Sequence, residues 1–430
     1  MVYRLILIFI IFSFAWTQSY FNRSLGSTIP ISSSRVMAMG SVNLIDYSSS
    51  SSLFSPSLLA SNSIGFTADL FLVNESIVER RGVNVKDYFG DYLTNADYVV
   101  NRNNYNNLYG GLIYGLGRNY FSISKNIISS FSYDYVEEVH GRYSLGDDEI
   151  GNKDPISGFH NLKIDGEMES VSIGYARSGK VFDFGLGYHF IPSSSVTERL
   201  WIDTLSTNNT NLSSVVAHSS TYDMESDTKY SIGFNFHINK TTNLLLSFLS
   251  RSLLSSDNSY QFFINEEGII SHTYIDDQAS VNYIDTKLSF RSPQITSLGI
   301  QHIPKGLSET MVAVELDMFN QEFSYRFGNN YLNQKKNRYR FSLGVEYIQD
   351  KTSFRTGLSY MTRYFESVDP VSTFSLGIGK KIDALEFDFA IQYQLSTHTF
   401  PDMFPIDNNL DSELENINES SLFIIFGIRY

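Results

Sequence analysis

The stretch SSLFIIFGIRY, residues 420–430, decides the fold. Successive side chains of a β-strand point to opposite faces, so residues two apart share a face. Gly427 and Arg429 fall on one face of such a strand. The other face is apolar throughout and consists of Leu422, Ile424, Phe426, Ile428 and Tyr430. The alternation predicts a half-buried strand that ends on an aromatic residue.

The segment 385–396 shows the same alternation and indicates which face meets the solvent. Its apolar face contains Leu385, Phe387, Phe389, Ile391, Tyr393 and Leu395, whereas Glu386 and Asp388 lie opposite. Two carboxylates facing lipid hydrocarbon would be costly, so the acids point inward. Comparable segments occur at 181–190, 230–238, 341–347 and 354–360. With weaker candidates we count about 14 to 16 strands, which predicts an all-β chain forming a transmembrane antiparallel β-barrel of about 14 strands.

The amino end predicts export. After Arg4, the apolar run 5–15 leads into polar residues 17–19, as in a signal peptide spanning 1–17. The run is shorter than the roughly 20 residues that a spanning helix needs, although an uncleaved anchor is the alternative. The chain contains no cysteine, which excludes a disulfide framework and a lipoprotein anchor.

The composition narrows the class further. A hydrophobic content of 42% and a mean hydropathy of −0.15 would suit a soluble protein, but barrel strands show lipid only at every second residue. The 28 Tyr and 33 Phe residues are typical of interfacial girdles. A soluble aromatic-rich β-protein is disfavoured because so many strands outgrow a sandwich core. The net charge of −14 disfavours nucleic acid as a partner.

Four polar stretches, 74–107, 137–166, 192–213 and 398–419, are expected to be long extracellular loops. The last is rich in Asp and Glu, whose oxygen atoms could hold Ca²⁺. Its spacing lacks the central glycine of a calcium loop, so a solvated acidic loop is favoured. No metal and no cofactor are expected.

A family resemblance lies in the segment before the first strand. The core SSRVMAMGSV, residues 33–42, is followed by a serine run at 48–52 and by LFSPSLLA at 53–60. An Arg-x-x-Ala-Met-Gly stretch, a spacer of small residues and a proline turn resemble the N-terminal region of the outer-membrane long-chain fatty-acid transporter family (the FadL/TodX group). PorV-like barrels of secretion machinery share that opening. This chain keeps only the proline, Pro56, of the family's usual Asn-Pro-Ala-Gly turn.

The resemblance implies that residues 18–60 form a hatch inside a barrel of residues 61–430. A barrel of this size has a lumen too wide for its own side chains to fill. Gly40 would permit close backbone approach, Pro56 would fix the turn into the wall, and Arg35 would pair with lumenal carboxylates such as Glu386 or Asp388. The candidate gating residues are Arg35, Met37, Met39, Gly40, Phe54 and Pro56. The alternative is that they only shape the fold.

Several apolar residues face the lumen by alternation, which an aqueous pore would not require. These candidate pocket residues are Phe71, Val73, Ile348, Met361, Phe423 and Ile425. They would line a site for a hydrophobic ligand or pack against the hatch. The sequence contains no His-Glu-x-x-His and no Gly-x-Ser-x-Gly motif, so we expect no enzyme. A wall pair such as His189 with Asp183 is the enzymatic alternative.

The predicted function is a hatch-gated outer-membrane channel for uptake of hydrophobic small molecules, either fatty-acid-like or aromatic. The driving force would be removal of apolar surface from water, about 25 cal/mol per Å², and release could occur sideways into lipid. Outer-membrane lipid and, through Tyr430, the barrel-assembly machinery are the expected partners. The alternative is a PorV-like scaffold that acts through protein partners.

Overall fold

The computed structural model describes residues 27–28, 33–140, 156–205, 212, 218–255, 263–264, 270–271, 286–327, 330–363, 370–401, 404 and 414–430. The signal peptide expected at 1–17 lies outside these residues. Within them, no helix has both the length and the apolar character needed to cross a membrane.

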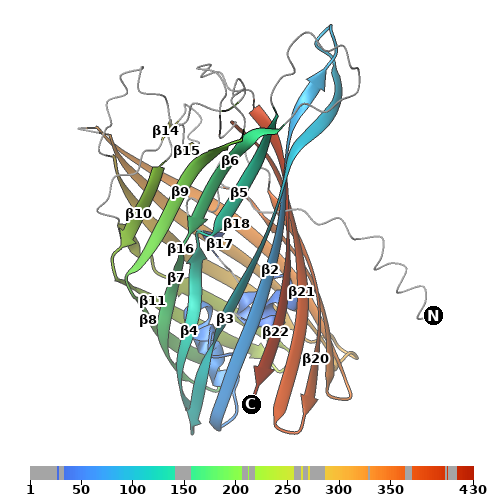
Figure 1. Ribbon diagram of the computed structural model, residues 1–430. Coiled ribbons are helices and arrows are strands. Elements are labelled where there is room, and N and C mark those ends of the chain that lie inside the picture. Colours follow the sequence, from blue (N-terminus) through green and yellow to red (C-terminus); the bar gives the residue numbers. More distant parts are fainter. Residues whose placement is uncertain are drawn as a thin grey trace, which may run out of the picture.

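Among the described residues, fourteen antiparallel strands close into a barrel (Figure 1), which confirms the predicted fold class. The seam joins the first barrel strand to the last, because β2 pairs with β22 from Asp69–Arg429 to Gly82–Asn416. The strands are β2 (Gly65–Lys86), β3 (Tyr92–Leu116), β4 (Asn119–Ser130), β7 (Glu167–Arg177), β8 (Phe182–Ile191), β11 (Asp227–Asn239), β12 (Thr242–Leu249), β16 (Thr286–His302), β17 (Thr310–Phe327), β18 (Asn330–Gln349), β19 (Thr352–Met361), β20 (Val371–Ile382), β21 (Leu385–Pro401) and β22 (Leu414–Arg429).

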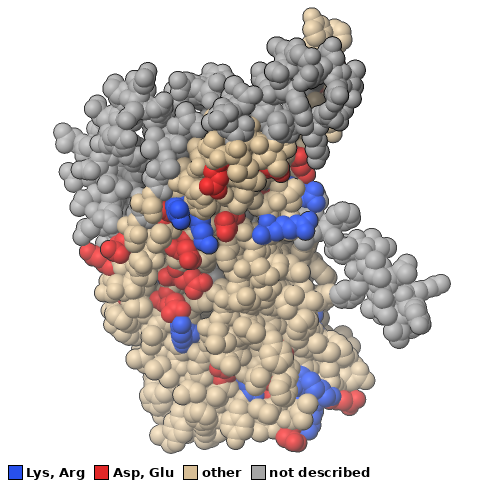
Figure 2. Space-filling model, viewed as in Figure 1, with Lys and Arg blue, Asp and Glu red and all other residues tan. Residues whose placement is uncertain are grey.

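The alternation of apolar and polar residues forms an outer belt and a polar lumen. In β8, Phe182 and Leu186 are exposed, whereas His189 is buried. In β22, Phe426 is exposed and its neighbour Ile425 is buried. Figure 2 shows charged side chains in the upper part of this face and near its lower rim, with one column of them descending past mid-height on the left; the surface to the right of that column, between the two groups, is largely uncharged. A barrel with such a belt is an outer-membrane protein of bacteria.

Four further strands form a second sheet above the barrel (Figure 1). They continue barrel strands across short breaks: β5 follows β4, β6 precedes β7, β9 follows β8 and β10 precedes β11. Their bounds are β5 (Tyr133–His140), β6 (Ile156–Asp165), β9 (Ser194–Thr204) and β10 (His218–Met224). The short strands β1 (Ser27–Thr28) and β13 (Leu253–Ser255) pair with β4 and β16, and β14 (Phe263–Ile264) pairs with β15 (Ile270–Ser271).

The loop bounds expected from the sequence are wrong where strands extend beyond the belt. Most of 74–107 belongs to the β2–β3 hairpin, and 194–204 is strand β9. Above the bilayer both faces of a strand can be polar, so the alternation disappears. The amide of Asn74 donates to Asn106 Oδ1 at 2.9 Å across this hairpin. The remaining expected loops, 137–166 and 398–419, begin and end in strand and otherwise lie largely outside the described residues.

Four short helices occupy the lower lumen (Figure 1). They are α3 (Ser34–Ala38), η1 (Asn43–Ile45), α4 (Ser51–Phe54) and η2 (Pro56–Ser61). Residues 33–62, which we call the plug, are almost entirely buried even though many of them are serines. The plug is therefore packed against the wall inside the lower part of the barrel.

Candidate functional site

Local sequence signals shape the plug. The Ser33 side chain accepts a hydrogen bond from the Val36 amide at 3.3 Å and caps α3, which is the preferred role of serine before a helix. Pro56 occupies the first turn of η2, where its missing N–H removes no internal hydrogen bond. Gly40 ends the α3 turn with φ +70°, a conformation that glycine adopts without strain.

Lumen-facing glycines of the wall form a seat for the plug. A Cβ on Gly357 would lie 2.1 Å from the Gly40 nitrogen, and one on Gly185 would lie 2.2 Å from the Pro56 carbonyl carbon. Conversely, a Cβ on Gly40 would lie 2.7 Å from the Leu358 nitrogen, so backbone meets backbone there. The wall glycines that a Cβ would bring into contact with plug atoms are Gly174, Gly185, Gly187, Gly233, Gly299, Gly344, Gly357, Gly377 and Gly427.

A buried ion pair joins the plug to the wall. Arg35 pairs with Glu346 at 2.5 Å and donates to the Ile45 carbonyl at 2.9 Å. The partner is a lumenal carboxylate, as the sequence predicts, but it is Glu346 and neither of the two examples named, Glu386 and Asp388. Arg355 connects Glu346 to Asp388, because its guanidinium pairs with Glu346 at 2.7 Å and also with Asp388.

Tyr47 extends the same network. Its hydroxyl donates to Glu386 at 3.0 Å. The guanidinium carbons of Arg35 and Arg429 lie 4.6 Å and 4.1 Å from the centre of its ring. Burial raises the pKa of the Tyr47 phenol, and the nearby Arg35 opposes that rise without reversing it. The phenol stays protonated at neutral pH and can donate its hydrogen bond.

The serine run attaches the other side of the plug. The Ser49 amide donates to Asp69 Oδ2 at 2.7 Å, and Ser231 Oγ donates to the Ser52 carbonyl at 2.6 Å. The hydroxyls of Ser52 and Ser124 are 3.4 Å apart. Short side chains thus let the wall bond directly to the plug backbone, and no single interaction dominates the attachment.

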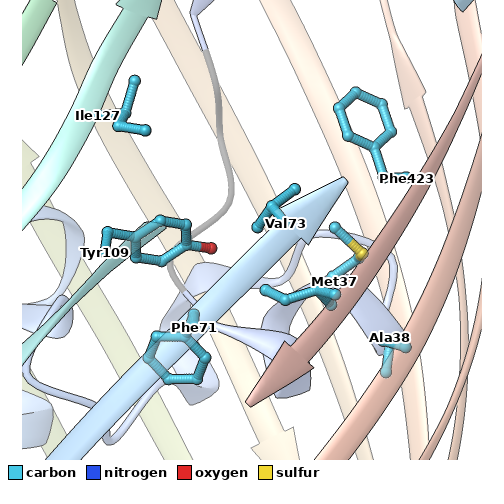
Figure 3. Packing of buried hydrophobic residues seen from close by; sticks show 9 residues of the cluster. Met37, Ala38, Phe71, Val73, Tyr109, Ile127 and Phe423 are labelled. Atoms are coloured by element: carbon cyan, nitrogen blue, oxygen red, sulfur yellow. The ribbon is translucent and has the colours of Figure 1, made fainter. Parts of the chain in front are cut away.

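Four of the six candidate pocket residues come together. Phe71, Val73, Phe423 and Ile425 are buried in one apolar cluster (Figure 3). The cluster also contains the candidate gating residue Met37, together with Ala38, Tyr109, Ile127 and Ala390. Sequence reasoning missed these last four, although Tyr109 faces inward by the alternation of its strand.

The other candidates lie elsewhere. Ile348 shares the inward phase of Glu346, but it is 45% exposed next to the short turn that ends β18 and so lies at the rim, away from the three clusters. Met361 and Phe54 pack against a second cluster of Leu53, Leu249, Ile295 and Phe319. Met39 belongs to a third cluster with Val36, Val42, Ile45 and Ala313.

The hydrogen-bond ladder of the barrel wall has a gap beside the first cluster. The pairing of β3 with β4 stops at Gly110 and Lys125, and above that point β3 pairs only with β2 among the described residues. Side chains bridge the strands again higher up, where Asn103 Nδ2 donates to the Asp134 carbonyl at 2.8 Å. Tyr109 and Ile127 flank the gap from its two sides. The short strand β1 pairs with β4 at Ser129 and Ser130, at the edge of this gap.

The suggested catalytic pair is not assembled. His189 lies between the hydroxyls of Ser172 and Ser231, each 2.9 Å from a ring nitrogen. Asp183 instead meets His237 Nε2 at 3.2 Å. The two residues are six ladder positions apart in the pairing of β8 with β11.

No protein-family profile and no curated protein matches the sequence. Solved structures do match. A FadL homologue of Pseudomonas aeruginosa aligns with a TM-score of 0.63 at 14% identity, over 94% of this chain and 99% of that chain. The toluene transporter TodX of P. putida aligns with a TM-score of 0.51 at 13% identity, over 97% and 99%. The resemblance to the FadL/TodX group is thus confirmed at the level of the fold.

Proposed function

We propose that the protein is a channel for uptake of hydrophobic small molecules across the outer membrane, gated by the plug. The observation that carries this proposal is the apolar cluster that links α3 of the plug, through Met37, to the gap between β3 and β4. An apolar solute that enters this cluster lies directly beside the acyl chains of the bilayer. Sideways release into lipid would then need no passage through the periplasmic mouth.

The contacts of the plug support a gating role. The plug is held by many moderate interactions, including the Arg35–Glu346 pair and hydrogen bonds from serines. Removing any one leaves the others in place, so part of the plug can shift while the remainder stays attached. The solved structures with the same fold are named as a FadL homologue and as toluene transporters, which agrees with an apolar cargo.

A disulfide lock tests the gate. Ser52 in α4 and Ser124 in β4 have hydroxyls 3.4 Å apart, so cysteines at both positions are within reach of a disulfide. The natural chain contains no cysteine to compete. We expect Ser52→Cys with Ser124→Cys to block uptake of radiolabelled oleate and of toluene by cells under oxidising conditions. Dithiothreitol should restore it.

The matched control links the wall to itself. Ser252 and Ser292 have hydroxyls 2.7 Å apart, and neither belongs to the plug. Cysteines at these two positions should form a disulfide without reducing uptake. Unchanged uptake in the fully oxidised Ser52–Ser124 lock would contradict plug gating. Absence of uptake even by the natural chain, with a soluble protein that copurifies, would favour the scaffold function instead.

A further inference from the structure

Short turns line the lower rim of the barrel, at the same end as the plug (Figure 1). They connect β3 with β4, β7 with β8, β11 with β12, β16 with β17, β18 with β19 and β20 with β21. Backbone hydrogen bonds join neighbouring turns; the Ser178 amide, for example, donates to the Arg118 carbonyl at 2.8 Å. Short turns of bacterial outer-membrane barrels face the periplasm. The rim is therefore a continuous polar edge at the periplasmic surface of the bilayer.

Exposed cations gather on one arc of this rim. The four turns from β3 to β17 adjoin one another, because β4 pairs with β7, β8 with β11 and β12 with β16. In or directly beside these turns lie five exposed cations, which we call the basic arc: Arg118, Arg177, Lys180, Lys240 and Lys305. The first three turns contain no acidic residue, and the fourth contains only Glu309. A chain with a net charge of −14 thus carries a cationic patch here.

The charges of the basic arc are not neutralised by neighbouring acids. None of the five cations forms an ion pair within the described part of the chain, whereas Lys125, higher on β4, pairs with Glu169 at 2.6 Å. Asp183 follows the second turn, but it is buried and its carboxylate meets His237 Nε2 at 3.2 Å. The rest of the rim differs, since Lys351 there adjoins Asp350 and Lys381 is two residues from Asp383.

The basic arc borders the lipid-facing surface of the wall. Arg177 ends β7 in the outward phase of Ile173, which is 56% exposed. Lys240 follows Ile238 by two residues, and Lys180 precedes the exposed Phe182 by two. Lysine and arginine at such positions lay their methylene stems along apolar surface and keep the charged group in the polar layer. The cations therefore lie at the level of the headgroups of the surrounding lipid.

We propose that the basic arc binds the phosphate groups of anionic phospholipids in the periplasmic leaflet. Arginine and lysine both form charge-assisted hydrogen bonds with phosphate. Neighbouring strands lie about 4.8 Å apart, so successive turns are about 10 Å apart along the rim and one headgroup fits between two cations. The turns are too short to enclose a folded partner, and the apolar side chains directly above them suit acyl chains. The site lies outside the lumen and does not depend on the channel function.

Quenching of tryptophan fluorescence by brominated phospholipids measures which lipid lies beside the arc. Phe182→Trp places a reporter on the lipid face, two residues from Lys180. This full-length protein is reconstituted in bilayers that contain brominated phosphatidylglycerol or brominated phosphatidylcholine. The emission of the natural chain, including Trp201 on β9, is subtracted as background.

We expect phosphatidylglycerol to associate with the reporter site about fivefold more strongly than phosphatidylcholine, which corresponds to about 1 kcal/mol for a cation beside an anionic surface. The preference should disappear in about 1 M salt, where the Debye length falls to about 3 Å. Equal quenching by the two lipids at low salt would overturn the proposal and would leave an acidic soluble partner as the ligand of the arc.

Two matched pairs of lysines locate the site. Lys180→Gln with Lys240→Gln should lower the preference at the reporter at least about twofold. Lys351→Gln with Lys381→Gln removes the same charge from the part of the rim that carries acids, and should leave the preference unchanged. A preference that survives in the first pair, or that both pairs lower equally, would overturn the assignment to the basic arc. All four lysines are exposed at turns, so their replacement leaves the packed wall intact.

Discussion

Replacing Gly377 with alanine should loosen the plug. The new Cβ would lie 2.4 Å from the Ala38 Cβ of α3, whereas carbon atoms in contact normally stay about 3.5–4.0 Å apart. The two surfaces must therefore separate by more than about 1 Å. Such overpacking costs about 1–3 kcal/mol. If this cost destabilises the seated plug relative to the displaced one, the fraction of molecules with a displaced plug rises about 5- to 150-fold.

The measurement is ionic conductance in planar bilayers, where the natural chain should be closed most of the time. Gly377→Ala should open more often, and adding Ala38→Gly should restore closure because the opposing methyl group is gone. Ala38→Gly alone is the matched control and should stay closed. Unchanged conductance in Gly377→Ala, or a double variant that conducts as much as the single one, would refute the reasoning about the glycine seat.

Arg35→Ala should leave Glu346 with only Arg355 as partner; because the buried carboxylate stays paired, the cost should be below the about 3–5 kcal/mol of a fully broken buried pair. The conductance of Arg35→Ala should rise, and that of Arg35→Lys should rise less. Equal conductance of the natural chain and both variants would argue against the ion pair as a contact that keeps the plug closed. Leu358→Arg, on the lipid face, should destabilise the barrel by about 2–4 kcal/mol, whereas Ile382→Arg, on the same outward face but at the rim, should cost about 0–1 kcal/mol. Denaturant unfolding from lipid vesicles measures both, and similar costs would contradict the position of the belt.

The barrel itself could be predicted because each strand carries its own signal. Glu386 and Asp388 fix which face is lumenal, and the strand that ends at Tyr430 has the same phase in the structure. The partner of Arg35 could not be predicted, since it depends on how deep α3 sits against β18 and β19. Nothing local in the sequence encodes that depth.

Other misses left a signal in the chain. Lys229 occupies the same inward phase as Ser231 and Gly233, opposite a run of apolar residues, so its burial followed from alternation alone. The gap beside Tyr109 had no such signal, because the end of a ladder depends on pairing with a distant strand. The asparagine-rich part of β3 was mistaken for a loop because its side chains bond one another rather than alternate with apolar ones.

The seam between β2 and β22 has a consequence for biogenesis. The wall cannot become continuous until β22, the last barrel strand in chain order, has been synthesised and has paired with β2. The plug precedes β2 in the chain and fits tightly against glycines from strands around most of the circumference. Inserting a folded plug into a completed barrel would require those contacts to form through the narrow mouth of the barrel. The nascent amino-terminal arm must therefore already be enclosed when the cylinder seals, so it can serve as the core around which the later strands assemble.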